Sequence, residues 1–173
     1  ATASSGRGLF LRNFFGAPNG YNDTVDFTGG NRCCGTPPGP IIEFIDNVFT
    51  GSGDDILDLD GTDAWIEGNI FLHVHRNGSP DSASAISGGA DNADTSQITA
   101  VGNLFFDVDQ AANAKQGNYY VFLNNTIVRQ NRTGSQDTNA AVVILADMNE
   151  QGVFTSEGRG MYLEGNIIAD AEN

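Results

Sequence analysis

One short motif occurs six times along this chain: a strand-like run, then an asparagine, then another short strand-like run. The six asparagines are Asn13, Asn47, Asn69, Asn103, Asn125 and Asn166. Successive asparagines lie 34, 22, 34, 22 and 41 residues apart, so the intervals share a base near 22 with insertions of two sizes. Self-similarity at a fixed period predicts a repeat architecture, in which each unit packs on its neighbours along one axis.

Residues at fixed distances from each asparagine form apolar columns. The column three residues before it holds Phe10, Phe44, Ile66, Ala100, Phe122 and Leu163. The column five residues before it holds Gly8, Ile42, Ala64, Ile98, Tyr120 and Met161, and the column two residues after it holds Phe15, Phe49, Phe71, Phe105, Ile127 and Ile168. Apolar residues at every second position are typical of strands. If the units stack at the strand spacing of about 4.8 Å, each column becomes a stack of side chains inside the coil.

A further strand-like run precedes most of the motifs, so each turn contains three short strands. These first strands are expected at 24–28, 56–60, 84–88 and 141–145, and a poorer match lies at 113–116. Three strands per turn predict an all-β parallel β-helix of about six rungs, with the insertions between strands. An antiparallel sandwich with asparagines in its turns is the alternative, and it does not explain the shared interval.

The asparagine motif resembles the right-handed parallel β-helices of the pectate-lyase-like superfamily. In that family a ladder of asparagines occupies the turn between the second and third strands, and the six asparagines of this chain match that ladder. The resemblance covers nearly the whole chain and implies a right-handed coil with amide hydrogen bonds from rung to rung. It also implies a substrate cleft over the first-strand sheet, where acidic residues hold Ca²⁺ or act as acid and base.

Size and charge restrict the organisation and the partners. The 173 residues fit a single domain spanning 1–173, and no amphipathic helix is available to cap the coil. We therefore expect a module of a longer secreted protein, or coil ends that pair with other copies. A net charge of −14 argues against binding to nucleic acid or to an anionic membrane, and no run of 18 apolar residues could span a bilayer. Abundant aspartate and a single lysine fit an extracellular or cell-surface bacterial protein.

The first strands carry the strongest candidate chemistry. Asp26 and Asp58 occupy equivalent positions on neighbouring rungs, as do Asp23 and Asp55. Stacked carboxylates repel unless a cation, a base or solvent separates them, and clusters with only oxygen ligands suit Ca²⁺. The candidate metal ligands are Asp23, Asp26, Asp55 and Asp58. The candidate catalytic residues are Asp26, Asp58, Asp60 and Lys115, and a solvated acidic face is the alternative.

Two local patterns leave alternatives open. The stretch 51–58 resembles one Gly- and Asp-rich Ca²⁺ repeat, but no tandem copy follows it, so it supports at most one Ca²⁺ at this turn. The neighbouring Cys33 and Cys34 form either a vicinal disulfide or two thiols.

A charged column lies four residues after the asparagines and contains His73, Asp107, Arg129 and Asp170. Its alternating charges predict an ion ladder between rungs. His73 and His75 alternate along one strand, so we expect them to point to opposite sides, the wrong geometry for a Zn²⁺ pair.

The outward positions of the second strands are unusually apolar and include Leu9, Trp65, Val121 and Tyr162. Such a face could stack on a sugar or be covered by a loop, another domain or another copy. Two functions therefore compete: a β-helical module with a carbohydrate-related role, as binder or stalk, and a polysaccharide lyase or glycoside hydrolase. Basic residues for lyase chemistry are few, which favours the module.

Overall fold

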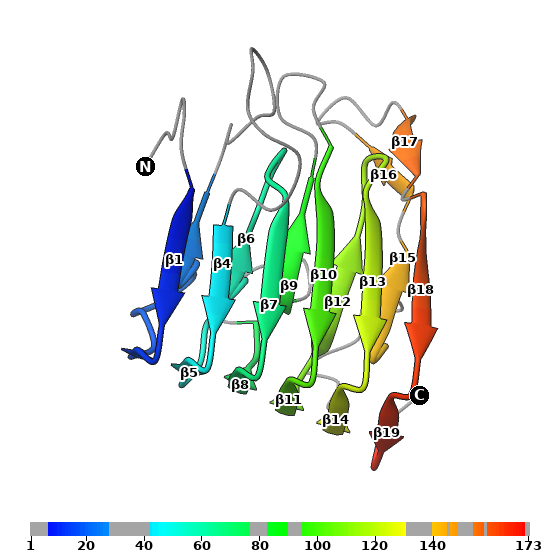
Figure 1. Cartoon of the computed structure of the whole chain (residues 1–173). Helices are drawn as coiled ribbons and strands as arrows, with labels where there is room; N and C mark the ends of the chain where they lie inside the picture. Colours follow the sequence, from blue (N-terminus) through cyan, green and yellow to red (C-terminus); the bar gives the residue numbers. More distant parts are fainter. Residues whose placement is uncertain are drawn as a thin grey trace.

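The computed structural model describes residues 7–27, 42–76, 83–89, 95–130, 140–144, 146–148, 154–157 and 159–171. These residues are all-β and contain no helix, so within the described part of the chain no helix is long and apolar enough to cross a membrane. Their strands stack side by side in chain order from one end of the molecule to the other (Figure 1). Cys33 and Cys34 lie outside the described residues.

The strands form three parallel sheets, which we name A, B and C. Sheet A contains β1 (Gly8–Leu11), β4 (Ile42–Ile45), β7 (Ala64–Glu67), β10 (Gln97–Val101), β13 (Tyr119–Leu123) and β18 (Gly160–Glu164). Sheet B contains β2 (Phe14–Phe15), β5 (Val48–Phe49), β8 (Ile70–Val74), β11 (Leu104–Val108), β14 (Thr126–Gln130) and β19 (Ile167–Ala169). Sheet C contains β3 (Val25–Asp26), β6 (Leu57–Asp58), β9 (Ser84–Gly88), β12 (Gln110–Ala114) and β15 (Val142–Ile144). About six rungs of the order A, B, C result, an arrangement compatible with a parallel β-helix.

The predicted columns are confirmed residue by residue in the strand register. Phe44 pairs with Phe10 and Ile66 in sheet A, and Phe71 pairs with Phe49 and Phe105 in sheet B. In the middle rungs these columns are fully buried. The rings of Phe49, Phe71 and Phe105 stack with centroids 5.0 and 4.9 Å apart, so the core contains a continuous aromatic stack in addition to its apolar area.

Each predicted asparagine lies in the corner between sheets A and B and bonds to the next. The side-chain Nδ2 donates to the Oδ1 of the following asparagine at 2.9 to 3.1 Å in all five steps. The same Oδ1 also accepts the backbone N–H of the preceding asparagine. The polar atoms of this corner are therefore paired although Asn47, Asn69, Asn103 and Asn125 are buried.

The residue before each asparagine makes the corner sharp. All six have a left-handed backbone, with φ between 54 and 67°: Arg12, Asp46, Gly68, Gly102, Asn124 and Gly165. Glycine, asparagine and aspartate tolerate this region best, and they fill five of the six positions. At Gly68 an added Cβ would also lie 2.6 Å from Asp46 Oδ1.

The first strands were predicted less accurately. β9 has the expected bounds, but β3 and β6 are only two residues long, and β12 begins at Gln110 rather than at Asn113. β12 begins earlier than predicted because Asp109 alone separates β11 from β12, whereas the alignment of the rungs predicts a longer connection. Lys115 therefore follows β12 instead of lying within a strand. Strands β16 (Ala146–Met148) and β17 (Phe154–Glu157) form an antiparallel pair that the repeat pattern did not indicate.

The ladder should account for a large share of the stability. In Asn103→Ala, the N–H and Nδ2 of Asn69 lose their shared acceptor and the carbonyl of Ile66 loses its donor. An unpaired buried polar group costs about 1–3 kcal/mol, so we expect the free energy of unfolding to fall by about 3–6 kcal/mol in a urea titration. In the control Asn22→Ala, which removes an exposed bond to Asn19, the loss should stay below about 0.5 kcal/mol. Equal losses in the two variants would contradict a stabilising ladder.

Candidate functional site

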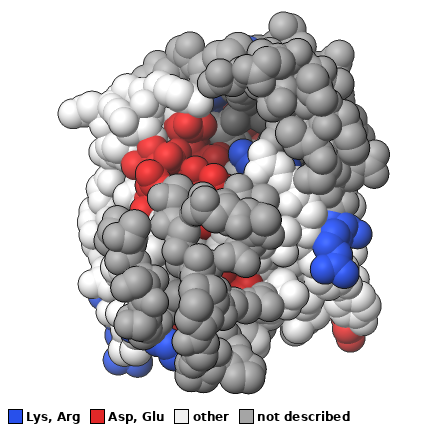
Figure 2. Space-filling view, turned by 90° about the horizontal axis from the view of Figure 1, so that it is seen from above, with Lys and Arg blue, Asp and Glu red and all other residues white. Residues whose placement is uncertain are grey.

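Acidic side chains gather in one patch on the face of the molecule seen from above, with a basic side chain at its edge (Figure 2). Within sheet C and the turns that lead into it, Asp23, Asp54, Asp55, Asp58 and Asp60 influence each other's ionisation. This acidic group is the first candidate site.

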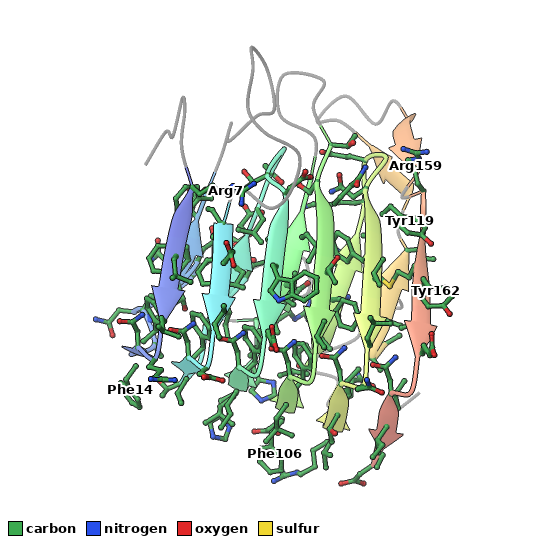
Figure 3. The ribbon with its side chains drawn as sticks, viewed as in Figure 1. Arg7, Phe14, Phe106, Tyr119, Arg159 and Tyr162 are labelled. Atoms are coloured by element: carbon green, nitrogen blue, oxygen red, sulfur yellow. The ribbon has the colours of Figure 1, made fainter. Side chains whose placement is uncertain are left out.

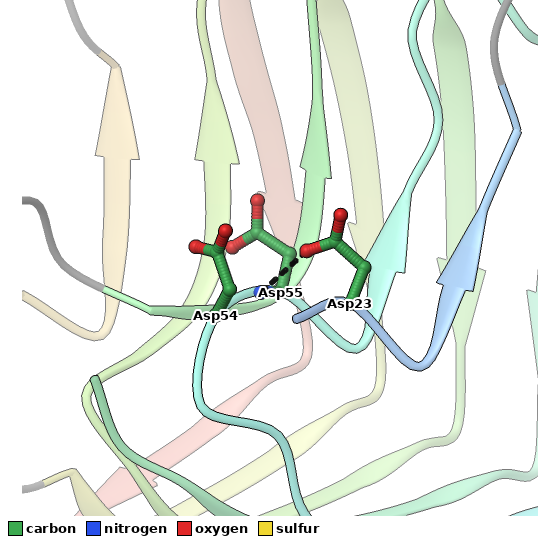
Figure 4. A group of neighbouring side chains, drawn as sticks. All are labelled: Asp23, Asp54 and Asp55. Carbon is green, nitrogen blue, oxygen red and sulfur yellow. Dashed lines mark hydrogen bonds between the residues drawn. The ribbon is translucent and has the colours of Figure 1, made fainter. Parts of the chain in front are cut away.

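The turn before β6 brings three aspartates together. Ser52 Oγ accepts the N–H of Asp54 at 3.3 Å and lies 2.9 Å from the carbonyl oxygen of Asp55, which closes the turn on itself. Asp23 Oδ1 accepts the N–H of Asp55 at 3.0 Å from the neighbouring rung (Figure 4). As a result, carboxylate oxygens of Asp23, Asp54 and Asp55 lie within 4.8 Å of one another and their carboxylates point to the same side.

The predicted metal set is thus only partly assembled. Asp23 and Asp55 belong to the group, Asp54 joins them, and Asp26 and Asp58 do not. Asp54 was missed as a member of this group because the prediction aligned rungs and ignored residues without an equivalent. The Gly- and Asp-rich stretch 51–58 was the signal that contained it.

Burial makes these carboxylates costly to ionise. The pKa of Asp55 rises from 3.8 to about 7, mainly because the side chain is buried. Lys115 lowers this pKa and Asp54 raises it, while Oδ1 accepts the N–H of Ser84 at 2.7 Å. The pKa of Asp23 is also raised, again chiefly by burial. A bound cation would offset this cost, and three carboxylates suit Ca²⁺.

Asp58 is a second carboxyl group whose pKa is strongly raised. Its pKa rises to about 8 because of burial and the nearby charges of Asp60 and Asp55, against which Lys115 acts. A protonated carboxyl beside a second carboxylate is the arrangement that general acid catalysis uses. Asp60 is held by the N–H of Gly89, whereas Asp26 pairs with Asp58 in the strand register and is exposed.

A polar row on sheet C continues from these aspartates. Asp26, Asp58, Ser87 and Asn113 are paired in register across β3, β6, β9 and β12. The preceding column, which contains Leu57, Ile86 and Ala112, belongs to the core, so strand alternation places the polar row on the opposite face. Asp58 Oδ1, Ser87 Oγ and Asn113 Oδ1 are buried without a hydrogen-bond partner. Three such atoms in one row are unusual, because buried polar atoms normally bond to protein, water or ligand.

The second candidate cluster overturns a sequence expectation. His73 and His75 do not point to opposite sides, because both contact the same carboxylate: His73 Nδ1 lies 2.7 Å and His75 Nε2 3.3 Å from Asp107 Oδ2. The prediction failed because His73 has a left-handed backbone, with φ of 53°, which breaks the strand alternation.

The predicted ion column also exists in part. The guanidinium of Arg129 lies 3.8 Å from Asp107 Oδ1 and packs 5.3 Å from the centre of the Phe106 ring. The Arg129 side chain is half-exposed, and the contact at this long distance contributes at most about 1 kcal/mol.

The outward face of sheet A retains its apolar character. Leu9, Leu11 and Tyr162 are exposed, and Tyr119 and Tyr162 project from β13 and β18 (Figure 3). The indole N–H of Trp65 donates to Glu67 at 2.8 Å. The occupant of this face stays a prediction.

In comparisons with known proteins, no protein-family model, no curated protein and no solved structure matches the chain. The description of the site therefore rests on its geometry.

The raised pKa values predict a dependence of stability on pH. A carboxyl whose folded pKa exceeds its unfolded value stabilises the fold below the unfolded pKa of about 3.8, and this contribution is lost as pH rises through the folded value. Without divalent cations, the free energy of unfolding should therefore fall between pH 4 and pH 8, with Asp55 contributing on the order of 3–4 kcal/mol. Asp55→Asn, which keeps the acceptor for Ser84, should flatten this fall in EDTA-containing denaturant titrations.

Asp46→Asn is the matched control, because Asp46 lies at an exposed corner far from sheet C in the register. Its pH profile should equal that of the unmodified protein. An unchanged slope in Asp55→Asn would contradict a buried, protonated Asp55.

Proposed function

We propose that this chain is a right-handed parallel β-helical module of the pectate-lyase-like type, part of a secreted bacterial protein, that binds a polysaccharide over sheet C. The observation that carries the proposal is the polar row of Asp26, Asp58, Ser87 and Asn113 on the face of sheet C opposite to the core, beside a group of carboxylates with raised pKa values. The periodic row matches the form of the ligand, because a polysaccharide presents hydroxyl groups at regular intervals.

Ca²⁺ at Asp23, Asp54 and Asp55 completes this site. The ion would offset the repulsion between the three carboxylates and stiffen the turn before β6. It would also attract an anionic sugar, which the net charge of −14 would otherwise repel. Lys115, close enough to lower the pKa of Asp55 and Asp58, offers a second positive group to the same sugar.

Catalysis is the second candidate, and Asp58 is the observation that favours it. Its raised pKa would allow it to donate a proton to a glycosidic oxygen, with Asp60 or Asp26 as the partner carboxylate. Lys115 would be the base of a lyase. We favour binding because basic residues are scarce.

Binding should depend on both the row and the ion. We expect affinity electrophoresis against polygalacturonate, alginate and neutral glucans to show retardation by at least one acidic polysaccharide in 1 mM Ca²⁺ and not in EDTA. Asp54→Asn should not bind the polysaccharide even in 1 mM Ca²⁺, because the ion site is incomplete. Asn113→Ala should weaken polysaccharide binding about 10-fold, because one to two hydrogen bonds are lost. Asp46→Asn should bind normally.

The same samples distinguish the two candidates. Unsaturated products or new reducing ends that disappear in Asp58→Asn would establish an enzyme. Retardation without product supports the module. No binding to any polysaccharide, with Ca²⁺ shown to raise the melting temperature, would leave the metal group intact and contradict the proposed ligand.

A further inference from the structure

Both histidines of this chain meet at the ends of β8 and β11, and the N–H of His75 donates to the carbonyl of Ser52 in the turn before β6. His73 lies in β8 and His75 directly follows it, while Asp107 lies in β11 and Asp109 directly follows that strand. The left-handed backbones of His73 and Asp107, with φ of 53° and 60°, turn both imidazoles toward one carboxylate oxygen.

Asp109 fixes the orientation of the central histidine. Its side chain is 0% exposed; Oδ1 lies 2.9 Å from His75 Nδ1, and Oδ2 accepts the N–H of Arg76 at 3.2 Å. The backbone of Asp109 is held as well, because its carbonyl accepts from Gln130 Nε2 at 2.8 Å. A carboxylate only accepts hydrogen bonds, so Nδ1 of His75 carries a proton.

The other ring nitrogen of His75, Nε2, lies next to Asp107, and this contact is favourable only with a cation between the two atoms. In a neutral His75 protonated at Nδ1, Nε2 presents a lone pair to Asp107 Oδ2 at 3.3 Å. Two lone pairs at this distance repel, and a proton or a metal ion between them removes the repulsion. A histidine whose far nitrogen donates to a buried carboxylate is the arrangement that orients imidazoles toward metal ions in proteins.

We propose that His73, His75 and Asp107 bind a divalent transition-metal ion, Zn²⁺ in the first instance, with Asp109 as the residue that positions His75. Two imidazole nitrogens and one carboxylate oxygen are ligands that Zn²⁺ takes, and three protein ligands leave a fourth position for water. The site differs from the all-oxygen group of Asp23, Asp54 and Asp55, which suits Ca²⁺.

Binding requires a rearrangement, because the ligand atoms of His73, His75 and Asp107 do not all lie within 4.8 Å of one another. His73 Nδ1, now 2.7 Å from Asp107 Oδ2, has to move to the side of the ion, and its side chain is 55% exposed and able to do so. His75 and Asp109 stay in place, since Asp109 is anchored by its neighbours. Arg129 contacts the other oxygen of Asp107, so Oδ2 is directed toward the histidines.

Zn²⁺ titration of the whole chain, with a chromophoric chelator as competitor at pH 7.5, tests the proposal. One ion per chain should bind with a Kd below about 10 µM. His75→Ala and the double variant His73→Ala/His75→Ala should bind at least 100-fold more weakly, and Asp109→Asn about 10- to 100-fold more weakly. Asp54→Asn, in the acidic group, should bind Zn²⁺ as the unmodified protein does.

Imidazole ¹⁵N spectra provide a readout that a purely structural role would not produce. Because the chain has two histidines, every imidazole signal comes from this site. Zn²⁺ should shift the Nε2 signal of His75 and the Nδ1 signal of His73, and Asp109→Asn should change the tautomer of His75 before any metal is added. Should Asp109→Asn fail to fold by circular dichroism, Asp107→Asn takes its place and should lower Zn²⁺ affinity at least 10-fold.

Three outcomes would overturn the proposal. The first is a Kd weaker than 1 mM in the unmodified protein. The second is unchanged affinity in the double histidine variant. The third is a loss in Asp54→Asn as large as that in His75→Ala, which would place the ion in the acidic group of sheet C.

Discussion

The amide ladder is the interaction on which the rest of the structure depends. A corner between two parallel sheets leaves backbone donors and acceptors inside the molecule, where an unpaired group is expensive. The side-chain oxygen of each asparagine accepts both the backbone N–H and the side-chain amide of the preceding asparagine, as Asn103 Oδ1 does for Asn69. Because every step repeats the same bonds, the sheets on either side are held in register, and the phenylalanine stack follows from that register.

The register of the strands was predictable from the sequence because it depends on asparagine and apolar side chains that recur at fixed positions. Asparagine at the corner and apolar residues at −5, −3 and +2 are visible without coordinates, and all of them pair as expected. The first strands were less predictable. β3 and β6 are two residues long, and the start of β12 depends on how tightly the chain turns at Asp109, which composition does not reveal.

The sites were harder to predict because they depend on backbone angles and burial. The sequence indicated Asp23 and Asp55, yet the third carboxylate comes from Asp54, which lies in a turn closed by Ser52. The histidine pair was misjudged for the same reason, since alternation fails where a non-glycine residue adopts a positive φ. The sequence allows the polar residues of sheet C to be aligned as a column. It does not reveal that three side-chain atoms of this column lack hydrogen-bond partners.

The ladder's amide bonds stay between 2.9 and 3.1 Å long whether successive asparagines are 22, 34 or 41 residues apart. Extra residues between rungs therefore leave the geometry of this corner untouched. In a solenoid of this kind, the corner asparagines and the core residues must be kept, whereas the connections between rungs can change. Insertions and duplications at the other corners can alter the outer surface over evolutionary time, while selection on the core acts on little more than one amide and a few apolar positions per turn.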